Sequence, residues 1–310
     1  MTWILLAAGG QLLLAVVAIL DKYIVTDTKV MPRPFVYAFY SCLMTGGWMA
    51  IYLLAFIPGV AALGVPSLQN VGAPTIQVVG MSFFAAYTLF MALVSMYESL
   101  KQAEAADVMP VIGATSALTA FGLSYMLLGT VLSSTFIWGI SLLVIGTALV
   151  SQFQFSRFVA LHAVHSGLFF GLHFLAMKGL FTETNFDDGF FWSRVSFILF
   201  ALSLLLVPTY YHKIKKQTQS TSAASGLLVL FTKILAGVGA FLLLKATDFG
   251  EVAVVQATDG LKFAFIVIIA IVLGRFLPKS ASKTHYTTHT IVRKTLFISI
   301  IIIGYILLFQ

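Results

Sequence analysis

The chain has 310 residues, of which 60% are hydrophobic and only 9% are charged, and its mean hydropathy is +1.00. A water-soluble domain carries about 25% charged residues, so this composition excludes a soluble fold and predicts an integral membrane protein. The net charge of +7 does not indicate a nucleic-acid partner, because the basic residues lie in short connections between apolar segments, where membrane proteins place them.

Long apolar segments recur along the whole chain, and a membrane-spanning helix needs about 20 such residues. The sequence predicts an all-α, polytopic fold with ten transmembrane helices, near residues 3–24, 34–57, 75–98, 107–128, 132–152, 157–180, 189–209, 225–246, 250–274 and 291–309. The first segment lacks a basic start and is too long for a signal peptide, so we interpret it as the first span. The only cysteine is Cys42, which excludes an intrachain disulfide.

An internal repeat relates the two halves of the chain. The stretch "AILDKYIVTDTKVMPRPFVYAFYS" aligns without a gap with "FLAMKGLFTETNFDDGFFWSRVSF", so that Lys22 matches Lys178 and Thr26 matches Thr182. In a second pair, "QAEAADVMPVIG" and "DFGEVAVVQATDG" each open the fourth helix of a half after an acidic turn. The chain therefore consists of five helices written twice, in residues 1–153 and 154–310. Because five is odd, we expect an inverted repeat, on which alternating access is commonly built.

These repeats, together with the corner "YESLKQAEAADVMPVIGATSALTAFGLSYMLLG", resemble the drug/metabolite transporter superfamily in its ten-helix, EamA-like branch. The resemblance covers nearly the whole chain and implies a secondary transporter with two EamA-like halves. Arg194 is similar to the arginine often found in the second helix of each family repeat. The chain departs from the family pattern at Thr130 and Arg275, where the family often has Glu, and at Gln256, where the first half has Pro110. These departures leave the subfamily and the substrate open.

The distribution of lysine and arginine predicts an orientation in the cell's inner (cytoplasmic) membrane. Most of these residues fall in the connections that follow the odd-numbered helices, whereas the opposite side has Lys178, Arg194 and Lys245. The positive-inside rule then places the first set of connections in the cytoplasm and both termini outside. The family resemblance implies the reverse, with both termini in the cytoplasm.

The ninth predicted helix carries polar residues within hydrocarbon. Gln256, Asp259 and Lys262 step by three and share one helix face, and each charge costs about 2.5–3.5 kcal/mol on insertion scales. Asp259 could pair with Lys262 or with Lys233 of the preceding helix, which would lower that cost. Such a pair could serve only to hold two helices together. Alternatively, these residues and Arg194 line a substrate path, which we favour because intramembrane ionisable residues often mark functional sites.

Three histidines of the sixth predicted helix, His162, His165 and His173, share one face. They could relay protons, because imidazole titrates near neutral pH, or they could simply pack at the membrane interface. The sequence offers them no cysteine and no close acid, so we expect neither a metal site nor a cofactor.

The corners before the fourth and ninth helices are both acidic. Glu98 and Lys101 belong to the first corner and Glu251 to the second. They could form gates that exchange salt bridges as the halves move, or they could be solvated turns. In the fourth helix, a stripe of small residues at spacing four, Ser116, Ala120 and Ser124, predicts close helix packing in lipid.

The sequence favours a secondary carrier that moves a small metabolite, an amino acid-like solute or an amphipathic drug. No GxxxxGK[ST] loop indicates an ATP motor, and no catalytic arrangement indicates an enzyme, which is a distant third possibility. The excess of bases over acids favours a solute with an anionic group. The rival hypothesis is a non-transporting scaffold or sensor, whose interior would be filled by Phe and Leu. The expected partners are the solute and the lipid bilayer, and a homodimer is left open.

Overall fold

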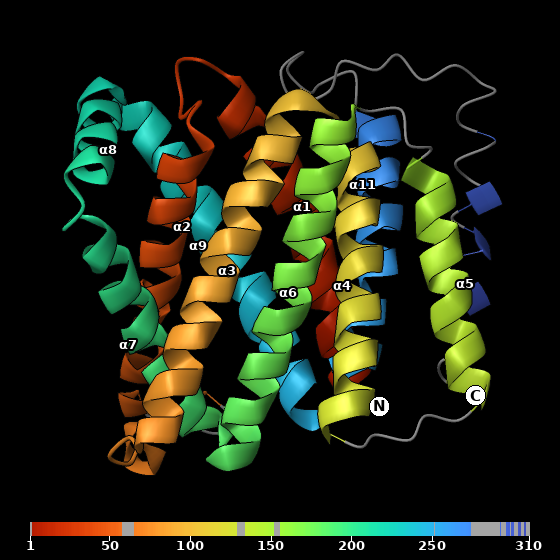
Figure 1. Cartoon of the computed structure of the whole chain (residues 1–310), viewed down its shortest axis with the longest axis horizontal. Helices are drawn as coiled ribbons and strands as arrows, with labels where there is room; N and C mark the ends of the chain where they lie inside the picture. Colours follow the sequence, from red (N-terminus) through yellow and green to blue (C-terminus); the bar gives the residue numbers. More distant parts are fainter. Residues whose placement is uncertain are drawn as a thin grey trace.

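The computed structural model describes residues 2–57, 65–128, 134–151, 156–250 and 252–273, with isolated residues between 292 and 307. Its elements are α1 Thr2–Thr26, α2 Pro34–Gly47, η1 Trp48–Phe56, η3 Leu68–Asn70, α3 Ile76–Gln102, α4 Ala105–Leu128, α5 Ser134–Ser151, α6 Arg157–Glu183, α7 Phe186–Leu204, α8 Pro208–Ser220, α9 Ala223–Phe249, α10 Val252–Ala257 and α11 Asp259–Leu273. These ranges contain helices and no strand, which confirms the all-α prediction for this part of the chain. Figure 1 shows most of the long helices side by side in one bundle.

The helices identify a multi-pass membrane protein. Among the described residues, six spans are long and apolar enough to cross a membrane, or seven if the bent pair α7 and α8 counts as one; the six are α1, α2 with η1, α3, α4, α6 and α9. By contrast, α10 and α11 have 6 and 15 residues and are separated by Thr258. Thr130, Glu251, Arg275 and most of the predicted span 291–309 lie outside the described residues. The count of ten spans therefore stays a prediction.

The connection before α9 differs from the prediction. The predicted spans end at residue 209 and resume at residue 225, which leaves a connection between them, but residues 208–220 form the helix α8. Pro208 occupies the start of this helix, where its fixed backbone angle suits the first turn and its missing N–H is not needed. The axis of α8 is bent by 98° from that of α7. The chain therefore turns sharply before α9 begins.

Two pairs of helices join the first half of the chain to the second. Helix α1 runs antiparallel to α9, because Asp21 contacts Lys233 while the backbones approach closely at Gly10 and Gly239. Helices α3 and α6 are also antiparallel: hydrogen bonds join Ser99 to Val159, Ser166 to Ala92, and His173 to Ala85. The third helix of each half thus packs against the first helix of the other half (Figure 1).

The lysines that align in sequence make equivalent contacts. Lys22, near the end of α1, donates from Nζ to the carbonyl oxygens of Leu100 and Ala103, at 2.7 and 2.9 Å. Lys178, near the end of α6, donates to three carbonyl oxygens at the end of α9, at 2.8–3.3 Å. The last carbonyls of a helix have no partner within the helix and attract a cation. Each lysine therefore binds the C-terminus of the third helix in its own half.

Small residues let α4 and α6 approach closely. A Cβ atom added at Gly167 would lie 2.6 Å from the Cβ of Thr115, and one added at Gly171 would lie 2.7 Å from that of Thr119. Ser116, the first member of the predicted small-residue stripe, is buried beside both glycines. In lipid, helices associate through such close packing. The first residue of the stripe predicted from spacing therefore lies against two glycines of α6.

We expect Gly167→Ala to lower the free energy of unfolding by about 1–3 kcal/mol, the usual cost of overpacking. The added methyl group would meet the backbone of α4 at Ile112 as well as Thr115, so it has no room to move aside. The measurement is thermal or denaturant unfolding of the protein in nanodiscs. Gly226→Ala on α9 is the control, because a Cβ atom there meets nothing within 4 Å. Equal stability of the two variants would contradict the close contact.

Candidate functional site

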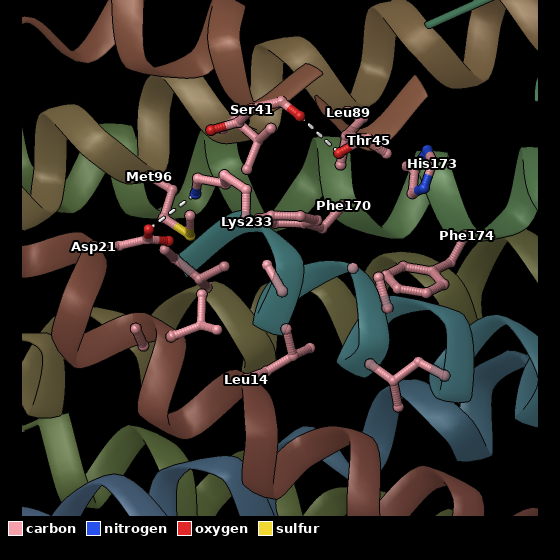
Figure 2. A pocket seen from close by; sticks show the side chains of 18 of the residues that line it. Leu14, Asp21, Ser41, Thr45, Leu89, Met96, Phe170, His173, Phe174 and Lys233 are labelled. Carbon is pink, nitrogen blue, oxygen red and sulfur yellow. Dashed lines mark hydrogen bonds and ion pairs between the residues drawn. The ribbon is translucent and has the colours of Figure 1, made fainter. Parts of the chain in front are cut away.

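A cavity of about 150 Å³ lies in the middle of the bundle, between α1, α2, α3, α4, α6, α7, α9 and α11. Figure 2 shows its apolar side chains, among them Leu14, Met96 and Phe170, beside the polar ones. Its polar and charged lining consists of Asp21, Ser41, Thr45, Trp48, Tyr97, His173, Arg194, Lys233, Asp259 and Lys262. Both halves of the chain contribute to this lining, so the cavity lies at the contact between them.

A buried ion pair joins α1 and α9 at the cavity wall. The Nζ atom of Lys233 lies 2.9 Å from a carboxylate oxygen of Asp21, and both side chains are almost fully buried. Lys233 also donates to the hydroxyl of Tyr97 at 2.8 Å, and the hydroxyl of Tyr37 donates to Asp21 (the Asp21–Lys233 pair is drawn in Figure 2). A buried charge is tolerated when it is paired and its remaining hydrogen-bonding groups are satisfied. The pair therefore ties together α1, α2, α3 and α9.

Aromatic rings complete the surroundings of Lys233. Its ammonium group lies 4.1 Å from the centre of the Tyr37 ring and 5.1 Å from that of Tyr97. The two rings are themselves in contact, with centroids 4.4 Å apart. Ser41 joins Tyr97 to α2, since its hydroxyl lies 3.0 Å from the hydroxyl of Tyr97 and donates to the main-chain carbonyl of Tyr37. Cation–π contact adds to the ionic stabilisation of a desolvated lysine.

A second ion pair lies at the start of α11. Lys262 Nζ is 2.9 Å from Asp259 Oδ2, and the amide of Gln11 on α1 donates to Asp259 Oδ1 at 2.6 Å and to Thr258 at 3.2 Å. The helical spacing of three brings the lysine and the aspartate together without help from another element. The Oε1 atom of Gln11 is buried and has no hydrogen-bond partner within the described part of the chain. This network fixes the first turn of α11 against α1.

Arg194 on α7 is buried differently from the two lysines. Its guanidinium packs over the rings of Phe190 and Phe197, at 4.4 and 4.7 Å from their centroids. It makes two long hydrogen bonds, to Ser193 Oγ at 3.4 Å and to the carbonyl of Thr45 at 3.5 Å. Within the described ranges, no carboxylate lies at ion-pair distance from it. A guanidinium has five N–H donors in a planar fork. Arg194 therefore lines the cavity with donors still to satisfy and, among the described residues, with no carboxylate to compensate its charge.

The histidines of α6 do not form one connected chain. His173 lines the cavity and its Nδ1 donates to the carbonyl of Ala85 at 2.9 Å. His165 contacts Ser95 at 2.7 Å, and His162 contacts the carbonyl of Phe158 in its own helix at 2.9 Å. Each ring thus has its own partner. In the part of the chain that the structure describes, no three His, Cys, Asp or Glu side chains could together hold a metal ion.

The structure brings four of the predicted path residues to the cavity, together with the relay candidate His173; the four are Asp259, Lys262, Lys233 and Arg194. Of the two partners predicted for Asp259, the structure has Lys262, whereas Lys233 pairs with Asp21. Glu98 and Lys101 are not among the residues that line the cavity, and Lys101 donates to the carbonyl of Pro32 at 2.8 Å. Glu251 and the side chain of Gln256 lie outside the described part.

Sequence reasoning missed three central residues of this site, Asp21, Tyr37 and Tyr97. Asp21 carried a usable signal, because it is an acid within the first apolar segment and intramembrane acids often mark a function. In the sequence prediction, only its neighbour Lys22 has a part, as a marker of the repeat. The tyrosines gave no such signal, since a tyrosine in an apolar segment is common at membrane interfaces.

No family model and no curated protein matches this chain. A solved structure described only as "Crystal structure of protein" superposes on it with a TM-score of 0.64, at 16% sequence identity, over 99% of this chain and 96% of that chain. At this identity the likeness shows a shared fold and nothing about a ligand or an activity.

Proposed function

We propose that this chain is a secondary carrier, built from two inverted five-helix halves, that moves a small solute with an anionic group by alternating access. The observation that carries this proposal is a central cavity, lined by both halves, in which the buried cation Arg194 has no carboxylate partner among the described residues. Membership of the drug/metabolite transporter superfamily, in its EamA-like branch, is part of the same proposal.

The helix contacts support the inverted repeat. Each half ties its first helix to its third through an aligned lysine, Lys22 or Lys178. Between the halves, the first helix of one runs antiparallel to the third helix of the other, in both possible combinations. Exchanging the two halves therefore preserves this set of contacts. Carriers with inverted repeats place their site between the repeats near the midplane, and this cavity is lined by both halves, including residues near the middle of α6 and α9.

The charges support an anionic solute. Arg194, Lys233 and Lys262 line the cavity together with Asp21 and Asp259, so three cations face two carboxylates and one positive charge is left over. Both lysines are already paired with acids. An uncompensated charge in a low-dielectric interior is costly, and a carboxylate or phosphate group on the solute would remove that cost. A guanidinium binds such groups in a bidentate manner.

The size and lining of the cavity limit the rest of the solute. A cavity of roughly 150 Å³ can hold a molecule about as large as benzene. Its apolar lining includes Leu89, Phe170 and Phe174, on the helices α3 and α6. We therefore favour a small, partly apolar anion over a sugar or a polyanion. The scaffold hypothesis expects an interior filled by Phe and Leu, so an open, partly charged cavity supports the carrier.

The carrier hypothesis is tested by a substitution that fills the cavity with a larger side chain. A panel of small carboxylates and phosphates is first screened by thermal stabilisation of the purified protein, and the best ligand is followed in proteoliposomes. Ala236 lines the cavity from α9, whereas Val238, two residues further on, is exposed on the outside of the same helix. We expect Ala236→Phe to reduce flux to the level of protein-free vesicles and Val238→Phe to leave it intact.

Two outcomes would contradict the carrier. If the wild-type protein transports none of the ligands that stabilise it, the scaffold or sensor hypothesis is favoured over the carrier. If Ala236→Phe remains folded and transports normally, the solute does not pass through this cavity.

We also propose that the protein lies in the cytoplasmic membrane with its termini outside, as the positive-inside rule predicts.

A further inference from the structure

Helix α8 leaves the bundle at a steep angle and carries a cluster of basic residues. Its axis is bent by 98° from that of α7. In Figure 1 it lies at the upper left edge of the molecule, beside the start of α2. The sequence "PTYYHKIKKQTQS" contains three lysines and no acid. The proposed transport cycle gives this helix no role.

One side of α8 is packed against the protein. Ile214 and Gln217 are buried, and the ring of Tyr210 lies 4.7 Å from that of Phe35 at the start of α2. Arg33, which precedes α2, donates to the carbonyl oxygen of Lys213 at 3.3 Å. These contacts hold the helix in one orientation, so its outer side presents a fixed surface.

The outer side of α8 is basic. Lys213, Lys215 and Lys216 are exposed, and Lys29 in the connection between α1 and α2 is exposed near the same end of the bundle, where its carbonyl accepts a hydrogen bond from Ser225. Asp27 is the acid closest to this group in sequence, and its carboxylate accepts a hydrogen bond from the backbone N–H of Lys29. The basic face thus combines cations from α8 with those of the neighbouring connection.

The approach to α8 changes from apolar to basic along the chain. Leu206 is 83% exposed and Val207 40% exposed at the bend, and Tyr211 follows with 43% exposure. Lys213, Lys215 and Lys216 follow one to two turns after the start of α8 at Pro208. Exposed aliphatic side chains favour acyl chains, tyrosine is enriched at the membrane–water interface, and lysine favours the headgroups. Side chains suited to the acyl chains, to the interface and to the headgroups therefore occur together at the bend and on α8.

We propose that α8, with Lys29 and Arg33, is a docking surface for the phosphate groups of anionic lipids in one leaflet. A lysine near an anionic membrane surface contributes about 1 kcal/mol, which is about a fivefold change in affinity. The three lysines of α8 together give the protein a selectivity for anionic over zwitterionic lipid. This surface works whether or not the protein is a carrier.

The test uses the whole protein in nanodiscs of phosphatidylcholine with and without phosphatidylglycerol. Spin-labelled phosphatidylglycerol and phosphatidylcholine report the relative affinity of each lipid for the protein surface. We expect the wild type to prefer phosphatidylglycerol, and the triple variant Lys213→Gln/Lys215→Gln/Lys216→Gln to lose most of that preference. The matched control Lys213→Arg/Lys215→Arg/Lys216→Arg keeps the charges and should keep the preference. Adding inorganic phosphate should weaken it no more than chloride at equal ionic strength.

A second measurement needs no variant. A water-soluble amine reagent, followed by mass spectrometry, reports how accessible each lysine is. We expect Lys213, Lys215 and Lys216 to react more slowly in nanodiscs with phosphatidylglycerol than in nanodiscs without it, while Lys245, near the opposite end of α9 from the contact with Lys29, serves as reference. Equal rates in both membranes, or an unchanged lipid preference in the glutamine variant, would overturn the proposal and favour a soluble acidic partner.

Discussion

Replacing Arg194 with glutamine is expected to abolish solute binding and, at the same time, to leave the empty protein as stable as the wild type or more stable. Truncating one partner of a buried charge pair costs about 2–5 kcal/mol, which is roughly a 30-fold to several-thousand-fold loss of affinity for an anionic solute. The empty protein, in contrast, loses a buried cation that has no carboxylate partner among the described residues. Removing an uncompensated charge relieves its desolvation cost.

The measurement is thermal unfolding with and without the best ligand, together with flux in proteoliposomes. Arg194→Lys serves as the control, because it keeps the charge but loses the planar fork, and we expect it to bind the solute weakly. A purely structural Arg194 would give the opposite result, in which the glutamine variant is less stable but retains ligand affinity. Loss of binding without loss of stability therefore identifies Arg194 as the anion site.

Breaking the pair between Asp21 and Lys233 is expected to destabilise the protein strongly. Either Asp21→Asn or Lys233→Met leaves its partner charged and buried, which costs about 3–5 kcal/mol. The double variant removes both charges and should lose clearly less than the sum of the two single variants. In Asp21→Asn, the hydroxyl of Tyr37 keeps a neutral acceptor at position 21 and Tyr97 keeps its hydrogen bond from Lys233, so the loss reports the missing charge.

Denaturant unfolding of the four proteins, in the same nanodiscs, gives the coupling energy of this pair. Glu183→Gln is a control for the removal of an acid, because Glu183 is exposed and a surface change of this kind alters stability by only about 0.5 kcal/mol. Strict additivity of the single variants would show that Asp21 and Lys233 contribute separately and that the four helices are joined by other contacts.

Short sequence patterns predicted the features of this fold that depend on residues close together in the chain. Apolar run lengths predicted α1, α3, α6 and α9, and helical spacing predicted that Asp259 and Lys262 share a face, where they form an ion pair. The alignment of Lys22 with Lys178 predicted that the two positions are equivalent. Each of these signals needs only the period of a helix or a gapless comparison of two stretches.

Contacts between distant segments could not be predicted in the same way. Asp21 and Lys233 are 212 positions apart, and only the packing of α1 on α9 selects Asp21 over Asp259 as the partner of Lys233. The fit of Gly167 against Thr115 likewise depends on the register of two helices, which apolar composition does not specify. Helix α8 was missed because its polar composition is also typical of a loop.

The hydrogen bonds between α3 and α6 end mostly on main-chain oxygens, whereas the contact between α1 and α9 includes one specific pair of charged side chains. A regular helix presents an equivalent carbonyl about 5.4 Å further along its axis. Ser99, Ser166 and His173 could therefore find new acceptors after a ratchet of one turn, a displacement known from other switching proteins. Asp21 and Lys233 would find no such replacement, so a one-turn displacement of α1 along α9 would break their ion pair, whereas the same displacement of α3 along α6 would leave acceptors for all three side chains.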